Sequence, residues 1–351
     1  MKFNQKIQIN RFTISEQSPV FIIAEAGVNH NGSIDLAKKL VNVAADAGAD
    51  AVKFQSFLTE ELILTGVEKA GYQKETTEQS ESQFQMLKKL EFEVDKMKLL
   101  KRYCEEKNVL FLTTPFDEKS LDLLDDLVLD AYKISSTDTT NIGFLRRVAA
   151  KNKPIILSTG MCSMHEVEHA LSVLSEINSN VILLQCTSNY PVIAEEANLN
   201  VIKTFKDKFK MIIGFSDHTP SIGASPYAVA MGAKVVEKHF TLNKDMEGPD
   251  HRASLNPQEL SAYIKEIRTV EQYLGSFEKI PSESELDTKN RLQKCLVASN
   301  EIKKGEKITT NNIIAKRTGG IGIPANEFDN VIGKTVSKNF SPNDIINLSN
   351  N

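Results

Sequence analysis

The strongest constraint on the fold is a set of eight short apolar runs, each ending on a polar residue that could take part in chemistry. The runs end at Glu25, Gln55, Thr114, Ser136, Thr159, Thr187, His218 and His239. Nearly continuous Val/Ile/Leu runs of this length are typical of strands in a parallel sheet buried on both faces. Stretches with helical periodicity lie between them, such as 36–47, 97–107 and 165–176. The alternation predicts an α/β fold, a (β/α)8 TIM barrel, whose active site lies where the carboxyl ends of the strands converge.

The bulk properties fit an ordinary globular protein. With 351 residues, the chain has room for a barrel and one small domain. A net charge of −4, without a basic run, argues against nucleic acid or an anionic membrane as partner. No signal-peptide core is visible and no apolar run approaches membrane-spanning length, so we expect a cytoplasmic location. The four cysteines have no metal or redox spacing, and we expect them to be reduced.

The distribution of apolar, polar and turn-forming residues along the sequence predicts how the chain is organised. Alternation within 1–18 predicts a hairpin that could plug the bottom of the barrel, with a loose tail as the alternative. The polar segment 58–96 follows the second strand and is long for a connection, so we predict a substrate lid. The barrel is expected to span 1–275, closing with a helix at 258–274, and the polar, turn-rich 276–292 predicts a linker. Short extended runs and glycine turns in 293–351 predict a small, mostly β domain.

Two histidines end the seventh and eighth runs. His218 and His239 would lie on adjacent strands and point toward the barrel mouth. Two neutral imidazoles make a partial metal site whose open positions are left to water and substrate. The scarcity of carboxylate and thiolate ligands favours a labile divalent cation such as Mn²⁺ over structural zinc. The alternative is that both rings belong to polar hydrogen-bond networks.

Two lysines end the second and fourth runs, with hydroxyls near them. Lys53 and Lys133, together with Ser136, Ser158 and Ser216, would suit a phosphorylated or polyanionic small molecule. Two cations in reach of each other repel unless an anion lies between them, which favours a function for the pair. In the alternative interpretation, one lysine is a Schiff-base nucleophile.

Four carboxylates are candidate acids or bases: Glu25, Asp138, Glu237 and Asp250. Glu25 and Glu237 lie in strand ends, where a carboxylate is costly unless it has partners. Asp250 follows a Gly-Pro turn and could equally be a turn-forming residue. Arg317, beside glycines in the small domain, could approach a ligand, although an exposed turn explains it as well.

Six segments, in order, resemble the bacterial sialic acid synthase family, whose members make N-acetylneuraminate and related nonulosonic acids. The segments are Ala24–Gly32, Val52–Gln55, Thr113–Phe116, Ile156–Met161, Gly214–Thr219 and Glu237–Thr241. The resemblance runs from about residue 20 to the C-terminus. It includes Gly248–His251 and the small domain, which is similar to the antifreeze-like (SAF) domain of that family. The resemblance therefore implies a TIM barrel over 1–275 and a SAF domain over 293–351.

The resemblance also implies a reaction. Phosphoenolpyruvate, an N-acetylhexosamine in its open-chain form and water would give a nine-carbon 2-keto acid and phosphate, with cleavage of the C–O bond. The substrate would be N-acetylmannosamine, giving N-acetylneuraminate, or a 2,4-diacetamido-trideoxymannose, giving N,N′-diacetyllegionaminate. The sequence does not decide between the two sugars. A domain-swapped homodimer is implied as well, with Arg317 reaching the partner's barrel.

Roles for individual residues follow from the same resemblance. Mn²⁺, with Mg²⁺ or Co²⁺ as a substitute, would be held by His218 and His239. Phosphoenolpyruvate would be bound by Lys53, Lys133, Ser136, Ser158, Ser188 and Ser216. The sugar would be contacted by Gln55, Asp138, Tyr190, Glu237, Asp250 and Arg317. We expect Glu25 to orient or deprotonate the water that adds at C2, and Asp250 to act with it in catalysis.

The chain departs from the family pattern at three places. Ser136-Thr137-Asp138 replaces a usual Ser-Gly-Glu, so the carboxylate is one methylene shorter. Arg317-Thr318-Gly319 replaces Arg-Pro-Gly, and Gln185 replaces a common histidine.

Two other functions fit parts of the sequence. One is a Schiff-base pyruvate lyase that uses Lys133 or Lys53. The other is a non-catalytic sugar- or ice-binding protein. The polar residues at the strand ends, Glu25, Lys53, Lys133, His218 and His239, argue against it, because a binding module needs no paired metal histidines.

Overall fold

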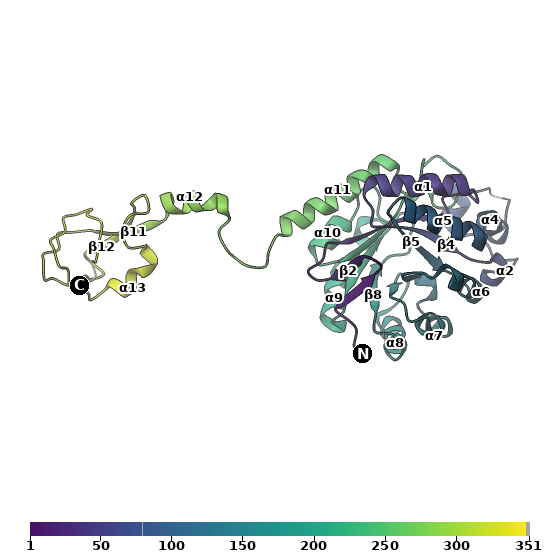
Figure 1. Ribbon diagram of the computed structural model, residues 1–351, viewed down its shortest axis with the longest axis horizontal. Coiled ribbons are helices and arrows are strands. Elements are labelled where there is room, and N and C mark those ends of the chain that lie inside the picture. Colours follow the sequence, from purple (N-terminus) through teal and green to yellow (C-terminus); the bar gives the residue numbers. More distant parts are fainter. Residues whose placement is uncertain (79, 349–351) are drawn as a thin grey trace. The chain divides into compact units, whose positions relative to one another are not determined.

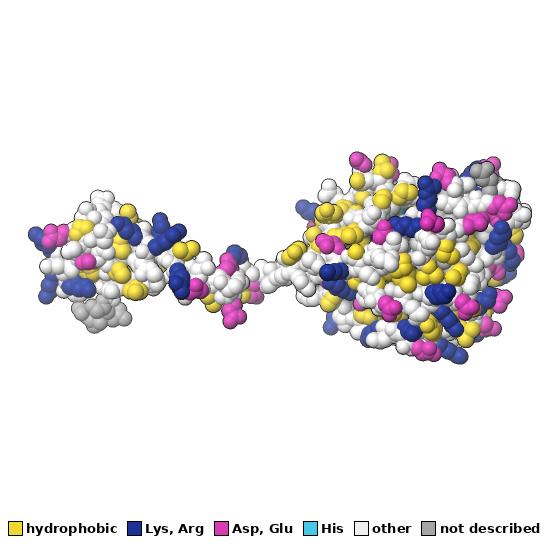
Figure 2. All heavy atoms as spheres, turned by 90° about the horizontal axis from the view of Figure 1, so that it is seen from above, with side chains coloured by type: hydrophobic (Ala, Val, Ile, Leu, Met, Phe, Trp, Pro, Cys, Tyr) yellow, Lys and Arg dark blue, Asp and Glu magenta, His cyan; other side chains and the backbone are white. Residues whose placement is uncertain are grey.

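The structure is a computed structural model that describes residues 1–78 and 80–348. It divides into two compact units, Met1–Gly275 and Ser276–Asn351. Within the described residues, no helix is long and apolar enough to span a membrane. All four cysteines are free. On the barrel unit, positive and negative side chains are interspersed over the visible face (Figure 2).

The first unit is built on eight parallel strands, as the apolar runs predict. Their order is β5-β4-β3-β10-β9-β8-β7-β6, and β5 also lies beside β6, so that the sheet curls into a barrel. Helices cover the outer face of the sheet (Figure 1), and nearly every strand residue is buried. The strands are β3 (Phe21–Gly27), β4 (Ala51–Ser56), β5 (Leu110–Pro115), β6 (Tyr132–Ile134), β7 (Ile155–Ser158), β8 (Val181–Cys186), β9 (Ile213–Asp217) and β10 (Val235–His239).

Helices on the outside of the barrel confirm the periodic segments. Ser33 caps the first of them by accepting from the Leu36 amide, and Gly48 ends it in the left-handed conformation, where a side chain would be strained. A large core cluster packs the inner faces of the helices against the sheet. The helices are α1 (Ile34–Ala47), α5 (Val94–Glu106), α6 (Glu118–Leu123), α7 (Ile142–Ala150), α8 (Met164–Ser175), α9 (Asn200–Phe209), α10 (Ser225–Ala230) and α11 (Pro257–Leu274).

The N-terminal segment is a hairpin, as predicted, and not a loose tail. Strands β1 (Lys6–Ile9) and β2 (Phe12–Ser15) pair antiparallel. Ile7, Ile9 and Ile14 are almost fully buried in a cluster with residues from the starts of the barrel strands, including Phe21 and Val235. Each such isoleucine contributes about 2 kcal/mol relative to an exposed one. The hairpin therefore closes the amino end of the barrel and leaves the carboxyl end to the ligand.

The long segment after β4 is partly helical. It contains α2 (Thr59–Leu62), α3 (Gly71–Thr76) and α4 (Gln83–Leu90). Ser82 and Gln85 form a reciprocal cap at the start of α4. A small cluster of Val28, Phe57, Met86 and Leu90 anchors this segment to the barrel. The polar composition of 58–96 therefore conceals a packed apolar layer.

The second unit contains a short two-stranded sheet of β11 (Lys294–Ala298) and β12 (Ile313–Arg317) and a short helix α13 (Phe328–Val331). It has a core of its own around Leu296, Ile302 and Phe340. The segment predicted as a turn-rich linker instead carries a helix, α12 (Glu283–Leu292), none of whose residues is buried. A reciprocal cap between Ser282 and Glu285 starts this helix, which the polar composition of the segment had masked.

Candidate active site

The carboxyl ends of the strands open into a cavity of about 570 Å³. This volume is typical of small-molecule sites. The residues that line it come from all eight strands or the loops just after them, and from the segment that carries α2 to α4. The predicted site residues found there are Glu25, Lys53, Gln55, Lys133, Ser136, Ser158, Ser188, Tyr190, Ser216, His218, Glu237, His239 and Asp250.

Two lysines and two glutamates form a buried charge cluster at the cavity floor. Lys53 Nζ lies 3.0 Å from Glu25 Oε2 and 3.6 Å from Glu237 Oε2. Lys133 Nζ lies 3.6 Å from Glu237 Oε1. The anion predicted to separate the two ammonium groups is thus present in the protein itself. The expectation that the lysines stay uncompensated without a ligand is therefore wrong, because sequence spacing does not show that Glu237 bridges them.

Burial and neighbouring charges shift the pKa values of this cluster. Burial raises the pKa of Glu25 to about 7, although the Lys53 charge opposes the rise. Burial would lower the pKa of Lys53, but Glu237 and Glu25 raise it above its ordinary value. Burial lowers the pKa of Lys133. Burial would raise the pKa of Glu237, but Lys133 and Lys53 lower it below its ordinary value. Glu25 is therefore the carboxylate of the pair that can exchange a proton near neutral pH.

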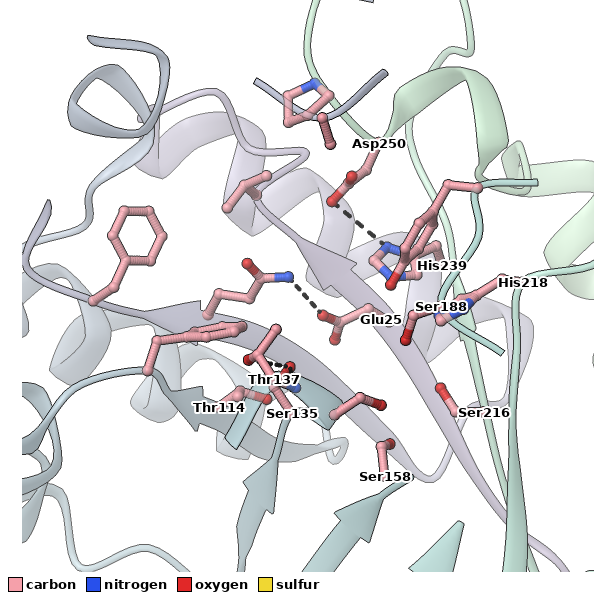
Figure 3. Close-up of a pocket in the computed structure, with 18 of the residues that line it drawn as sticks. Glu25, Thr114, Ser135, Thr137, Ser158, Ser188, Ser216, His218, His239 and Asp250 are labelled. Atoms are coloured by element: carbon pink, nitrogen blue, oxygen red, sulfur yellow. Dashed lines mark hydrogen bonds and ion pairs between the residues drawn. The ribbon is translucent and has the colours of Figure 1, made fainter. Parts of the chain in front are cut away.

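Hydroxyl groups surround the two ammonium groups. Lys133 Nζ donates to Ser158 Oγ at 2.7 Å, and Lys53 Nζ donates to Thr114 Oγ1 at 3.0 Å. Ser216 Oγ donates to Glu237 Oε1 at 3.3 Å. In Figure 3 the Ser158 and Ser216 hydroxyls lie below the Glu25 carboxylate, while Asp250 and His239, joined by a dashed line, lie above it. Ammonium groups and hydroxyls gathered in this way form a donor surface suited to an anion.

Gly160 holds two of the serines close to the backbone. Its amide donates to Ser136 Oγ at 2.8 Å. A Cβ at this position would lie 2.1 Å from Ser188 Oγ and 2.9 Å from Ser136 Oγ. Only glycine therefore allows both hydroxyls to approach this edge of the cavity.

The two predicted metal histidines lie together in the cavity, with His218 next to Ser188 (Figure 3). The ring centroids of His218 and His239 are 5.6 Å apart, and the Tyr190 ring packs 4.1 Å from His218. His239 Nδ1 lies 3.9 Å from Asp250 Oδ2. Burial lowers the pKa of His239 well below its ordinary value and raises that of Asp250 to about 6. Burial would lower the pKa of His218, but the neighbouring Cys186 outweighs this effect and raises it above its ordinary value.

The chemistry of this pair fits a divalent cation. His218 Nδ1 lies 2.8 Å from the carbonyl oxygen of Thr187, which can only accept, so Nδ1 carries the proton and the Nε2 lone pair is left to a metal. His239 Nδ1 is buried without a hydrogen-bond partner in the described structure. Within residues 1–78 and 80–348, no group of three or more His, Cys, Asp or Glu side chains is arranged for a metal. Water or substrate would have to complete the coordination.

Buried polar atoms without a hydrogen bond concentrate in this cavity, although Glu25 Oε2 and Glu237 Oε2 lie in ion pairs with Lys53. In the described part of the chain, five buried side-chain atoms make no hydrogen bond, and three of them belong to Glu25, Glu237 and His239. Buried polar groups in native proteins are nearly always hydrogen-bonded, and exceptions call for an explanation. The ion pairs with Lys53 account for the two carboxylate oxygens, so His239 Nδ1 is the atom in this cavity that a bound ligand would have to satisfy.

Three residues that the sequence singles out, as site residues or as departures from the family pattern, do not line the cavity. Asp138 is buried beside the cavity but does not line it, because its carboxylate accepts from Asn141 and Thr137 at the start of α7. Gln185 donates to the carbonyl of Ala197 and also lies outside the cavity. Arg317 ends β12 in the second unit, opposite Lys294.

Sequence reasoning missed the apolar side of the cavity. Residues of this side follow β3, β4 and β5 or belong to the region of α2 and α4, and they include Val28, Phe57, Leu62, Ile63, Met86, Leu87 and Phe116. The length of 58–96 indicated a lid, and the segment does border the cavity. The helical spacing of Met86 and Leu90 was the available signal for which residues face inward.

The chain matches known proteins over both units. Residues 40–279 match the NeuB family, and residues 293–350 match the SAF domain. The N,N'-diacetyllegionaminic acid synthase of Campylobacter jejuni is 47% identical over 93% of this chain and 98% of its own length. The human N-acetylneuraminate-9-phosphate synthase is 36% identical over 95% and 93%.

A solved structure agrees with these matches. The crystal structure of an N-acetylneuraminic acid (sialic acid) synthetase from Leptospira borgpetersenii, in complex with citrate, is 37% identical and has a TM-score of 0.73. The alignment covers 82% of this chain and 96% of that one. A family match over most of the chain, together with relatives well above 30% identity along nearly its full length, shows that the chain belongs to the NeuB family.

Proposed function

We propose that this protein condenses phosphoenolpyruvate with an N-acetylated aminosugar and water, giving a nine-carbon 2-keto sugar acid and phosphate. The observation that carries the proposal is the cavity floor, where a donor surface for an anion adjoins a buried carboxylate and two imidazoles. The names of the relatives, synthases of N,N'-diacetyllegionaminic acid and N-acetylneuraminate-9-phosphate, support it. Release of inorganic phosphate that requires both substrates is the direct test.

The lysine–serine side of the floor would bind phosphoenolpyruvate. Lys53 and Lys133 present ammonium groups, and Ser136, Ser158, Ser188 and Ser216 present hydroxyls. The ligand's phosphate and carboxylate would draw these donors away from Glu237, whose carboxylate holds the lysines in place when no anion is bound. Fixed donors around a substrate anion stabilise the charge that moves onto the departing phosphate.

The proposed chemistry joins the two substrates first and then adds water. C3 of phosphoenolpyruvate attacks the aldehyde carbon of the open-chain sugar, which forms the new C–C bond and leaves positive character at C2. Water adds at C2, and the tetrahedral intermediate expels phosphate by breaking the C–O bond. Glu25, with its pKa raised to about 7, would orient that water and accept its proton. Gln55 donates to Glu25 at 3.3 Å and would hold the carboxylate in position.

The sugar would occupy the side of the cavity above the floor. Gln55, Tyr190 and Asp250 line this part and offer hydrogen-bonding groups. The pKa of Asp250 is raised to about 6, so it can act as acceptor or proton donor near neutral pH. The carboxylate of Asp138, the other residue expected to contact the sugar, accepts a hydrogen bond from Asn141. Asp138 therefore forms no part of the proposed sugar site.

The sugar we propose is a 2,4-diacetamido-trideoxymannose, so that the product is N,N′-diacetyllegionaminate. Two of the relatives are synthases of this product, from Campylobacter jejuni at 47% identity and from Legionella pneumophila at 42%. Both exceed the 36% of the human N-acetylneuraminate-9-phosphate synthase. Assays of phosphate release with this sugar and with N-acetylmannosamine decide between the two.

We also propose that His218 and His239 hold Mn²⁺, or Mg²⁺ or Co²⁺ in its place. When bound, the ion would act as a Lewis acid on the sugar aldehyde. The two rings would fix its position beside Tyr190 and Asp250. Metal content gives a test apart from activity. Dialysed protein should bind one Mn²⁺ per chain, and His239→Ala should lose it, whereas His165→Ala, at an exposed position of α8, should retain it. Equal binding by both variants contradicts the assignment.

The assembly and location are part of the same proposal. We expect a homodimer in which Arg317 of one subunit completes the other subunit's cavity, in the cytoplasm. Arg317→Ala should therefore be nearly inactive alone. A mixture of Arg317→Ala with Glu25→Gln should regain part of the activity, since one of the mixed sites then carries both native residues. No recovery in mixed dimers contradicts a shared site.

A Schiff-base pyruvate lyase is the second candidate. Burial lowers the pKa of Lys133, as a nucleophilic amine requires. Lys53 suits this role less, because its carboxylate neighbours raise its pKa. Borohydride in the presence of pyruvate would trap a covalent adduct on Lys133 if the protein were a lyase, and would leave the mass of a phosphoenolpyruvate-dependent synthase unchanged.

A further inference from the structure

One side of the cavity is an apolar wall that the proposed chemistry does not use. We define this wall as Phe57, Leu62, Ile63, Met86 and Phe116. Phe57 and Met86 are each only 3% exposed and pack with Val28 and Leu90, while Leu62 and Phe116 are half buried against them. The wall therefore packs against a small apolar cluster of its own, apart from the charged floor.

Two carboxamides interrupt the apolar wall. Gln73 lies in α3, and Gln83 is the first residue of α4. Gln83 Nε2 donates to Gln73 Oε1 at 3.1 Å, and the Ala70 amide donates to the same oxygen at 3.0 Å. That bond uses one of the two N–H groups of Gln83, and a carboxamide also has a carbonyl oxygen. Gln83 can therefore offer both a donor and an acceptor to an amide group of a ligand.

The geometry of β4 relates the wall to the charged floor. Lys53 and Gln55 occupy alternate positions of β4, so their side chains project to the same side about 6.6 Å apart, and Phe57 follows directly after the strand ends at Ser56. All three line the cavity. The floor would hold phosphoenolpyruvate at Lys53, and the reacting aldehyde must lie next to it. The far end of the sugar then extends past Gln55 toward Phe57 and the wall.

We infer that the apolar wall and Gln83 select an aminosugar that lacks the 6-hydroxyl group and carries an acetamido group at C4. The inference rests on the proposed function. Leu62, Ile63 and Met86 have no atom that hydrogen-bonds well, so a 6-hydroxyl group held against them loses water without a replacement, whereas a methyl group gains contact. A 4-acetamido group presents the N–H and C=O that complement the carboxamide of Gln83.

Substitutions on the wall test this inference. Leu62→Gln places an amide against the C6 position, and Ile63→Thr is a smaller change of the same kind in case the first variant folds poorly. Gln83→Leu removes the carboxamide. Gln85→Leu is the matched control, because Gln85 lies on the same helix, is exposed and does not line the cavity. For each variant, kcat and KM for phosphate release are measured with 2,4-diacetamido-2,4,6-trideoxymannose and with N-acetylmannosamine.

The expected result is a change in preference. The wild-type protein should favour the trideoxy sugar. Leu62→Gln, Ile63→Thr and Gln83→Leu should each reduce its kcat/KM by about tenfold relative to that of N-acetylmannosamine. Gln85→Leu should leave the ratio unchanged, and any disturbance of α4 should affect both sugars equally.

The failures are distinguishable. If the wild-type protein releases phosphate with neither sugar, the proposed function itself is contradicted. If it is active but prefers N-acetylmannosamine, the inference about the wall is overturned and the synthase activity stands. Parallel losses with both sugars in Leu62→Gln, Ile63→Thr and Gln83→Leu overturn the inference in the same way.

Discussion

The ammonium group of Lys53 lies 3.0 Å from a carboxylate oxygen of Glu25, and strand pairing sets this contact. The two residues stand opposite each other on β4 and β3, and both are buried. Glu237 bridges from Lys53 to Lys133 on the other side. Two positive and two negative side chains therefore balance each other at the floor of the barrel mouth, and a substrate anion has to enter a cluster that is already paired.

Glu25→Gln should reduce kcat by about 100-fold or more, since the amide cannot accept a proton from the attacking water. The change preserves shape, and Lys53 keeps its contact with Glu237, so the melting temperature should shift little. Steady-state phosphate release and a thermal melt measure the two effects. Glu118→Gln, at an exposed position of α6, serves as control. An unchanged kcat would remove Glu25 from the chemistry.

Glu237→Gln should destabilise the folded protein by about 3 kcal/mol, because it leaves two buried ammonium groups without the carboxylate between them. Phosphoenolpyruvate should then raise the melting temperature of the variant more than that of the wild type, because its anionic groups take over the role of the carboxylate. Thermal melts with and without the ligand provide the measurement. An equal shift in both proteins contradicts binding of the anion at the lysines.

Gly160→Ala should raise KM for phosphoenolpyruvate by about tenfold, because the added Cβ displaces the Ser136 and Ser188 hydroxyls. Gly143→Ala is a matched control, since a Cβ at that position of α7 meets nothing within 4 Å. Substrate titrations of both variants compare the two positions. If KM stays the same in Gly160→Ala, these serines do not bind phosphoenolpyruvate.

The stability of the protein should depend on His30. This ring is fully buried against Phe92, and burial lowers its pKa to about 3. Below the unfolded value of about 6.5, the unfolded chain takes up a proton that the folded chain does not, so stability falls as pH falls from about 6.5 toward 3. Above about 6.5 this contribution is complete and constant.

The slope of the unfolding free energy against pH measures the contribution of His30. Urea unfolding between about pH 7 and pH 5 should show a decline of about 1.4 kcal/mol per pH unit from His30. His30→Gln should reduce the slope of the unfolding free energy against pH by the contribution of one proton. His165→Gln, at an exposed site, should leave the slope unchanged. An unaltered slope in His30→Gln would show that the ring is protonated in the folded protein as readily as in the unfolded one.

Much of this architecture is predictable from sequence because burial leaves a direct signature. A strand covered on both faces must be apolar throughout, and the eight runs show this. The carboxyl ends of barrel strands converge on one face, which predicts that one cavity contains Glu25, Lys53, Lys133, His218 and His239. The structure confirms this prediction. Family resemblance added Ser188 and Tyr190, which lie after a strand and carry no distinctive pattern of their own.

The rest depends on contacts between distant segments. The sequence indicates Glu237 as a candidate acid or base, but its position between two lysines depends on how strands β4, β6 and β10 face one another across the barrel. Asp138 was placed in the sugar site, but a local hydrogen bond to Asn141 turns its carboxylate away. The apolar wall comes from short helices inside a polar segment, where composition alone indicates only a long loop.

Isotope transfer tests the central claim most directly. Phosphoenolpyruvate labelled with ¹⁸O at its bridging oxygen is incubated with the protein, a divalent cation and 2,4-diacetamido-2,4,6-trideoxymannose, and both products are analysed by mass spectrometry. Water addition at C2 followed by C–O cleavage predicts that the label leaves with the phosphate and that a nine-carbon 2-keto acid forms. Label retained in the keto acid, or pyruvate formed without consumption of the sugar, would contradict the proposed reaction.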